Sequence, residues 1–293
     1  MPGPLLLSVP NVSEGSDRDT MNAIGAAFAP AALLDIHSDP DHGRSVFSLA
    51  APQGVLADAL VNGASEAVAR LDVTGHPGIH PHVGAIDVAP VVYLDDGRRG
   101  PAVAEALTAA ALIGDELELP VFLYGQLATS EAKRERAAIR RGGPQALKER
   151  IKSGELMPDF GPKRIHPTAG ALLVTARPPL IAFNLDLDTD DLELAKRIAA
   201  RLREANGGLT GVRAIGLHLP ARGRAQVSFN VHDHHAVPLR ILVEEVRAEA
   251  PIAEAELVGL APQAAFEGFP DDVPLRDFDP SRHLIENAVR SLH

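Results

Sequence analysis

The chain has 293 residues, of which 45% are hydrophobic and 4% aromatic, so it can form two modest domains or one large one, with mainly aliphatic cores. It has no cysteine, which excludes disulfides, thiolate nucleophiles and cysteine-ligated zinc. A net charge of −11 argues against a nucleic-acid partner, because neutralising phosphates requires clustered lysine and arginine. No stretch has the length and flanks of a signal peptide or a membrane span, so we expect a cytoplasmic protein.

The first part of the chain alternates between strand and helix patterns. Turn residues follow the first strand, and Ser16 or Asp17 can cap the helix after them. The predicted segments are, in order, a strand over 5–9, a helix over 18–27, strands over 32–36 and 44–49, a helix over 55–71, a strand over 84–94, a helix over 100–117 and a strand over 121–125. The first six segments follow the order β-α-β-β-α-β of the ferredoxin-like unit, and the last two extend its sheet.

Residues 76–88 are the most distinctive stretch, with three histidines, two prolines and two glycines before an apolar run. Proline fixes φ and lacks a backbone donor, so residues 75–82 cannot be a regular helix or a central strand. We expect a rigid loop that presents His76, His80 and His82 at the start of the next strand. Such loops commonly carry function, and histidine is the side chain that titrates nearest neutral pH.

The second half of the chain becomes charged and then repeats the architecture of the first. Residues 130–152 read as a helical segment, mostly a solvated face. Residues 158–170 are rich in proline and glycine, and composition alone favours a linker over a binding loop. A second β-α-β-β-α-β pattern follows over 180–260. We therefore predict an α/β (α+β) fold of two tandem ferredoxin-like subdomains, residues 1–177 and 178–293, with helices packed on their sheets and a crevice for small molecules between them.

Three further patterns accompany the histidine loop. The loop itself reads His-x-Gly-x-His-Pro-x-x-Gly-Ala-x-Asp-Val-x-Pro over His76–Pro90. Residues 9–15 read Val-Pro-Asn-x-Ser-Glu-Gly, and Arg44 ends the turn before the third strand. Residues 158–171 contain Pro-Asp-Phe-Gly-Pro followed by Pro-x-x-Gly-Ala. Together they resemble the motifs of the glutamate formimidoyltransferases, the formiminotransferase domain family that also occurs in formiminotransferase-cyclodeaminase. The resemblance extends to about Pro262.

This resemblance implies transfer of the formimino group from N-formimino-L-glutamate to the co-substrate tetrahydrofolate, a step of histidine degradation and one-carbon metabolism. It implies a homodimer without a required metal, and His80 as the catalytic acid/base. It also implies a folate-binding segment made of Gly161, Pro162, Lys163, Arg164, Ile165, His166, Pro167, Thr168, Ala169 and Gly170. The candidate residues for the second substrate are Asn11, Asp35, Asp39, Arg44, Asp87 and Arg177.

The chemistry of such a transfer fits a group with a pKa near neutral. It would take a proton from the incoming nitrogen and return it to the leaving one. A carboxylate beside it would hold the cationic species, and the sequence does not choose between Asp35, Asp39 and Asp87. The arginines considered for the substrate's carboxylates are Arg44, Arg177 and Arg224.

The sequence departs from the family's usual pattern at four positions, and it leaves other functions open. Where the family usually has Asp, Asn, Arg and an aromatic residue, this chain has His37, Gly43, His82 and Ala169. The alternatives are a paralogous folate enzyme acting on 5-formyltetrahydrofolate or another amidine, and a non-catalytic folate-binding protein. The loop histidines could also ligate a metal with an aspartate, but Pro81 restricts how the rings converge, so we favour metal-free catalysis.

Overall fold

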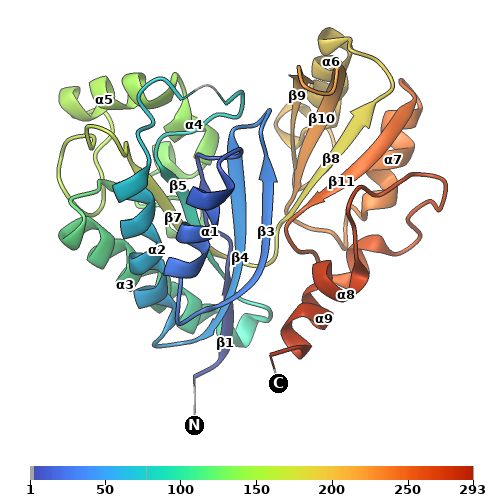
Figure 1. Ribbon diagram of the computed structural model, residues 1–293. Helices are drawn as coiled ribbons and strands as arrows, with labels where there is room; N and C mark the ends of the chain where they lie inside the picture. Colours follow the sequence, from blue (N-terminus) through green and yellow to red (C-terminus); the bar gives the residue numbers. More distant parts are fainter. Residues whose placement is uncertain (1–2, 77, 293) are drawn as a thin grey trace. The chain divides into compact units, whose positions relative to one another are not determined.

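A computed structural model describes residues 3–76 and 78–292 of the chain (Figure 1). Pro77, one of the two prolines of the histidine loop, lies outside the described residues. The chain divides into two compact units, Met1–Pro178 and Pro179–His293, each with its own sheet. No helix of the described residues is long and apolar enough to cross a membrane.

The first unit is built on a mixed sheet with helices on both faces. Its strands are β1 (Leu5–Ser8), β2 (Asn11–Val12), β3 (Ala32–Asp39), β4 (Arg44–Pro52), β5 (Ile86–Val92), β6 (Val121–Leu123) and β7 (Leu172–Arg177). Its helices are α1 (Arg18–Ala27), α2 (Leu56–Arg70), α3 (Arg99–Glu116), α4 (Arg136–Arg140) and α5 (Gly143–Ser153). Strand β4 pairs antiparallel with β1, β2 and β3, and β5 pairs antiparallel with β1 and β2. Strand β7 lies between β5 and β6 and runs parallel to both.

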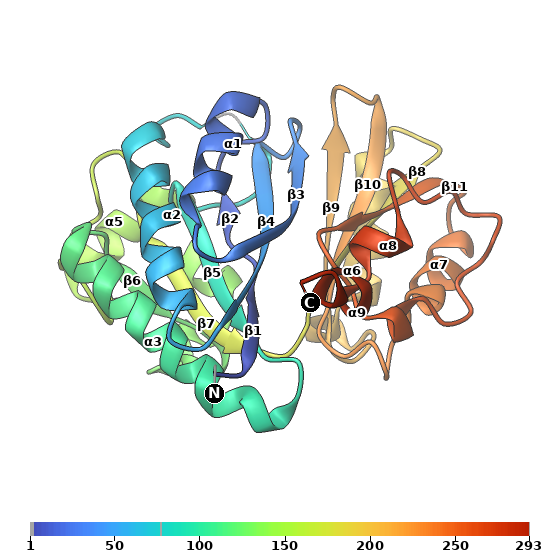
Figure 2. The same cartoon turned by 60° about the horizontal axis from the view of Figure 1, so that its bottom comes forward.

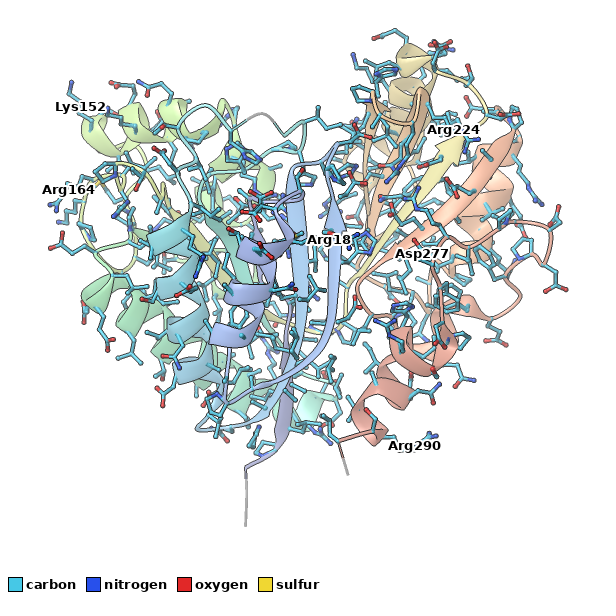
Figure 3. All side chains as sticks on the ribbon, viewed as in Figure 1. Arg18, Lys152, Arg164, Arg224, Asp277 and Arg290 are labelled. Atoms are coloured by element: carbon cyan, nitrogen blue, oxygen red, sulfur yellow. The ribbon has the colours of Figure 1, made fainter. Side chains whose placement is uncertain are left out.

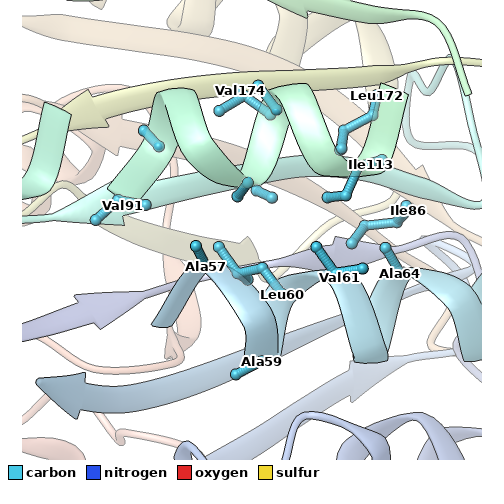
Figure 4. Close-up of a cluster of buried hydrophobic side chains, with 14 of the residues drawn as sticks. Ala57, Ala59, Leu60, Val61, Ala64, Ile86, Val91, Ile113, Leu172 and Val174 are labelled. Atoms are coloured by element: carbon cyan, nitrogen blue, oxygen red, sulfur yellow. The ribbon is translucent and has the colours of Figure 1, made fainter. Parts of the chain in front are cut away.

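The apolar pattern of each helix decides which face of this sheet it covers. Buried side chains of α2 at helical spacing, such as Leu60 and Ala64, meet Ile86 and Val91 of β5 and the buried face of α3 (Figure 4). Figure 2 shows α2 and α3 running side by side over the sheet. A second cluster on the other face joins α4 and α5 to β5, β6 and β7. The strands of this end are therefore buried on both faces, as expected for parallel strands.

Most of the predicted segments of this unit are confirmed, with two differences. Asp17 caps α1 by accepting hydrogen bonds from the backbone of Asp19 (3.0 Å) and Thr20 (3.3 Å). Pro10 divides the first strand, and its carbonyl accepts from the backbone of Phe47 (2.9 Å) between the two pieces. The sequence analysis missed β7, because its apolar run directly precedes the two prolines that were interpreted as a domain boundary.

The second unit is a four-stranded antiparallel sheet covered by helices. Its elements are β8 (Ile181–Leu187), α6 (Leu192–Leu202), β9 (Val212–Leu219), β10 (Arg224–Val231), α7 (Leu239–Arg247), β11 (Ile252–Val258), α8 (Pro280–His283) and α9 (Ile285–Arg290). The strand order is β11-β8-β10-β9, and α6 and α7 close one apolar core with the sheet. The mixed α+β class is confirmed, whereas the division into ferredoxin-like subdomains stays a prediction.

Buried polar groups of β8, β10 and β11 are hydrogen-bonded to one another. Asn184 donates to Glu256 (2.8 Å), and Gln226 donates to Asp186 (2.7 Å). Arg276, from the segment after β11, reaches Asp186 (3.4 Å) and Glu254 (3.2 Å). These pairs satisfy the buried charges of this unit locally.

Candidate active site

The histidine loop packs against the turn between β3 and β4. The backbone N–H of Ile79 donates to the carbonyl of Asp41 (3.3 Å), and the His42 ring stacks on the His80 ring with centroids 5.8 Å apart. Gly43 has φ of 61°, and a Cβ there would lie 2.7 Å from the Cα of Gly78. A side chain at position 43 would therefore push the loop away, which gives this departure from the family pattern a physical reason.

Arg44, at the start of β4, joins the loop to the sheet. Its Nε donates to Asn11 Oδ1 (2.9 Å), and one terminal nitrogen donates to the Pro81 carbonyl (3.3 Å) and contacts His80 Nδ1. Its other terminal nitrogen pairs with Asp87. Arg44 is buried, so the site depends on this guanidinium being held from several sides at once.

Asp87 is the fully buried carboxylate of the site. Its Oδ1 accepts from the backbone N–H of Val83 (2.8 Å), while Oδ2 pairs with both Arg44 and Arg140. Burial alone would raise the pKa of Asp87, but Arg140 and then Arg44 outweigh burial and lower it below its usual range. Asp87 is thus a candidate carboxylate that is connected to His80 through Arg44.

The surroundings of His80 favour the neutral form of its ring. Burial of the ring among protein atoms, and next the positive charge of Arg44, hold its pKa well below the usual 6.5. Its Nδ1 is within hydrogen-bond reach of Arg44, which can only donate, and of the Pro81 carbonyl (2.9 Å), which can only accept. These two partners favour opposite tautomers: the Pro81 carbonyl favours a proton on Nδ1 and leaves Nε2 free.

Arg140 was missed by the sequence analysis. It lies at the end of α4, within the segment interpreted as a solvated face, yet its side chain is 6% exposed and pairs with Asp87. The pKa of Arg140 falls to about 9, mainly because of burial. In the same segment, Lys133 is buried and pairs with Asp159 (2.7 Å), so Lys133 and Arg140 are exceptions in a segment that is otherwise mostly solvated, as predicted. Local composition gave no signal for either burial.

The other two loop histidines contact each other. The rings of His76 and His82 meet edge to face with centroids 4.7 Å apart, and burial lowers the pKa of both. Within residues 3–76 and 78–292, no group of three or more His, Asp or Glu has the geometry to hold a metal ion.

The predicted folate-binding segment has two parts that differ in environment. His166 and Gly170 exchange backbone hydrogen bonds (2.9 and 3.2 Å), and buried Ala169 accepts from the backbone of Ala85 (2.9 Å) just after the histidine loop. Lys163 and Arg164 are instead exposed, and Arg164 pairs with the exposed Glu118 (2.9 Å; Figure 3). The part near residues 166–170 therefore adjoins the end of the histidine loop.

The remaining candidates occupy different positions. Asp35 is buried in β3, and Asp39 accepts from the backbone of His42 (2.9 Å). Arg177 ends β7, and burial lowers its pKa to about 10, with Tyr124 beside it. Arg224 belongs to the second unit, whereas the histidine loop belongs to the first, and Arg224 pairs with Glu254 (3.5 Å).

Comparison with known families identifies the class of protein. The family model described as "Formiminotransferase domain, N-terminal subdomain" matches residues 5–177, and "Formiminotransferase domain" matches residues 182–268. The chain is therefore a transferase that belongs to the formiminotransferase family, which confirms the resemblance seen in its motifs.

Curated relatives give the more specific likeness. The chain is 38% identical to a glutamate formimidoyltransferase of Thermoplasma acidophilum, over 89% of each protein. It is 35% identical to the glutamate formimidoyltransferase of Streptococcus pyogenes serotype M1, over 96% of this chain and 97% of the relative. It is 36% identical to the formimidoyltransferase-cyclodeaminase of Mus musculus, over 89% of this chain but 51% of that longer protein.

Proposed function

We propose that the protein transfers the formimino group from N-formimino-L-glutamate to tetrahydrofolate, giving 5-formiminotetrahydrofolate and glutamate. Family membership and the names of the full-length relatives support the reaction. One observation supports the site: His80 lies in a loop held by a buried Arg44–Asp87 pair, with its Nδ1 2.9 Å from the Pro81 carbonyl.

The proposed chemistry needs one proton carrier. The folate amine attacks the amidine carbon, and Nε2 of His80 takes the proton that this nitrogen loses as the new C–N bond forms. The resulting imidazolium gives the proton to the glutamate nitrogen as the old C–N bond breaks, so that the amine leaves neutral. Nε2 is free to act in the tautomer that the Pro81 carbonyl favours, with the proton on Nδ1.

The positive surroundings of His80 suit the second half of this cycle. Burial and Arg44 keep its pKa well below 6.5, so the imidazolium formed in the first step is a stronger acid than an ordinary imidazolium. A strong acid donates readily to the leaving amine. Asp87 and Arg44 are positioning residues in this scheme, because they fix the loop and the ring rather than exchange the proton.

We also propose that residues 161–170 contact the folate and that Asn11 and Arg44 face the second substrate. The close approach of residues 166–170 to the end of the histidine loop supports the first assignment. A homodimer and a cytoplasmic location are predictions from the resemblance. Sedimentation equilibrium of the purified chain measures the oligomeric state directly.

The test is transfer from N-formimino-L-glutamate to tetrahydrofolate by the wild type, His80→Ala and His235→Ala. His235 is an exposed histidine of the second unit, stacked on His234 (centroids 4.1 Å), and serves as the matched control. We expect His80→Ala to lose about 100-fold or more in turnover, the usual share of general acid–base catalysis, with the control unchanged.

Two results would contradict the proposal. Equal turnover by His80→Ala and the wild type would remove His80 from the mechanism. A wild type that binds tetrahydrofolate, seen as a raised melting temperature, but transfers no formimino group would favour another folate reaction or binding alone.

A further inference from the structure

The buried charges around His80 do not balance. Asp87 carries one negative charge and pairs with two guanidiniums, those of Arg44 and Arg140. Nε of Arg140 is buried and has no hydrogen-bond partner among the described residues. Buried cations are normally paired and fully hydrogen-bonded, so this site has a surplus of positive charge and an unused donor.

Arg136 adds a third cation to the same place. It lies four residues before Arg140 on α4, so the two side chains lie on one face of the helix about 5–6 Å apart at Cβ. It is half-buried, and within residues 3–76 and 78–292 its guanidinium has no hydrogen bond and no ion pair. Its charge contributes to lowering the pKa of His80 and of Arg177, so it lies within electrostatic range of both.

Placing three guanidiniums near a single carboxylate is electrostatically unfavourable unless a further anion is bound. The chain has a net charge of −11, and other arginines of this unit, such as Arg134 and Arg164, pair with acidic residues on the surface. Arg136 instead lies within electrostatic range of Arg44 and Arg140 and lowers the pKa of both. Positions that weaken the folded protein in this way are typical of functional sites, where a ligand supplies the missing charge.

We propose that Arg136 and the free Nε–H of Arg140 form a subsite for a carboxylate of the substrate. The planar fork of a guanidinium suits a carboxylate's two oxygens, and the anion would neutralise the surplus charge. This inference rests on the proposed function, in which the formimino donor is an amino acid with two carboxylates. The glutamyl tail of the folate offers the same chemistry, and the two sources are separated by experiment.

The experiment measures equilibrium binding by calorimetry, with the intact chain and no turnover. The probes are glutamate, the product of the donor, and tetrahydrofolate, each titrated into the wild type, Arg136→Gln, Arg136→Lys and Arg141→Gln. Arg141 is an exposed neighbour of Arg140 and is the matched control. Loss of one charge-assisted hydrogen bond predicts about 10- to 100-fold weaker binding for Arg136→Gln, a smaller loss for Arg136→Lys and no change for Arg141→Gln.

The outcomes separate this inference from the proposed function. Weaker binding of glutamate alone assigns the subsite to the donor, and weaker binding of tetrahydrofolate alone assigns it to the folate tail. Unchanged binding of both by Arg136→Gln overturns the subsite, even if the wild type transfers formimino groups. Glutamate binding that depends on Arg136 in a wild type without transfer activity supports the subsite and refutes the proposed function.

A stability measurement excludes a merely structural role. Because Arg136 has no ion-pair partner among the described residues and its charge acts against those of Arg44 and Arg140, Arg136→Gln should melt at the wild-type temperature or above it. A clear fall in melting temperature would show that Arg136 holds the fold together, and it would overturn the assignment as a ligand-binding residue.

Discussion

Replacing Asp87 by asparagine tests the buried ion pairs on which the proposed site depends. The substitution keeps the size of the side chain, and its amide oxygen can still accept from the backbone of Val83. It removes the carboxylate charge that pairs with both guanidiniums, those of Arg44 and Arg140. Both arginines are buried, so water cannot take over the role of the carboxylate.

The expected loss is large for a single isosteric change. Breaking a buried pair by removing one partner destabilises a protein by about 3–5 kcal/mol. At roughly 2–4 °C per kcal/mol for a domain of this size, the melting temperature should fall by about 6–20 °C. The same change at an exposed pair, Glu118→Gln opposite Arg164, should stay within about 1 kcal/mol, because solvent screens that interaction.

Thermal and urea unfolding of the wild type and the two variants measure these differences. Arg140 and Arg44 lower the pKa of Asp87 below its unfolded value, so its contribution is present above about pH 4 and is lost as the pH falls through the folded pKa. The difference in unfolding free energy between the wild type and Asp87→Asn should therefore become smaller in acid. A loss no larger than that of Glu118→Gln at pH 7 would refute the reasoning.

Two further predictions concern the histidine loop and its neighbour. Burial and Arg44 hold the pKa of His80 below 6.5, so an NMR titration of its ring should give a midpoint below that value. Arg44→Gln should move the midpoint upward. A midpoint at or above 6.5 in the wild type would contradict this explanation. Gly170→Ala places a Cβ about 2.1 Å from the Val83 carbonyl oxygen and should lower the free energy of unfolding, measured in urea, by several kcal/mol. In the control Gly75→Ala, the added Cβ has no atom within 4 Å, so only the smaller strain of its positive φ should appear.

The sequence predicted the helices and most of the strands because local periodicity specifies them. It did not predict β7, whose run Leu-Leu-Val-Thr-Ala lies between two parallel strands and shows no alternation of apolar and polar residues. Its pairing with β5 joins segments more than eighty residues apart (Val88 with Leu173), and no local pattern encodes such a partner. The predicted domain boundary, between residues 177 and 178, directly follows this run.

The sequence also predicted only the part of the candidate site that local motifs specify. His80, Arg44 and Asp87 stand in recognisable motifs, and the structure joins them through Arg44. Arg140 and Arg136 lie in a charged segment whose composition is that of a solvated surface. Their burial follows from where α4 packs and from the carboxylate of Asp87, which are tertiary facts that a single sequence does not state.

The contacts of Arg44 also bear on how the protein folds. Arg44 is 33 residues from Asn11, 36 from His80 and 43 from Asp87, and Arg140 is 53 residues from Asp87. Each contact closes a long loop, so the constellation forms only after the sheet has brought distant segments together. During refolding, recovery of activity should therefore lag behind recovery of helical circular dichroism, because helices need only local contacts whereas the site needs the whole unit.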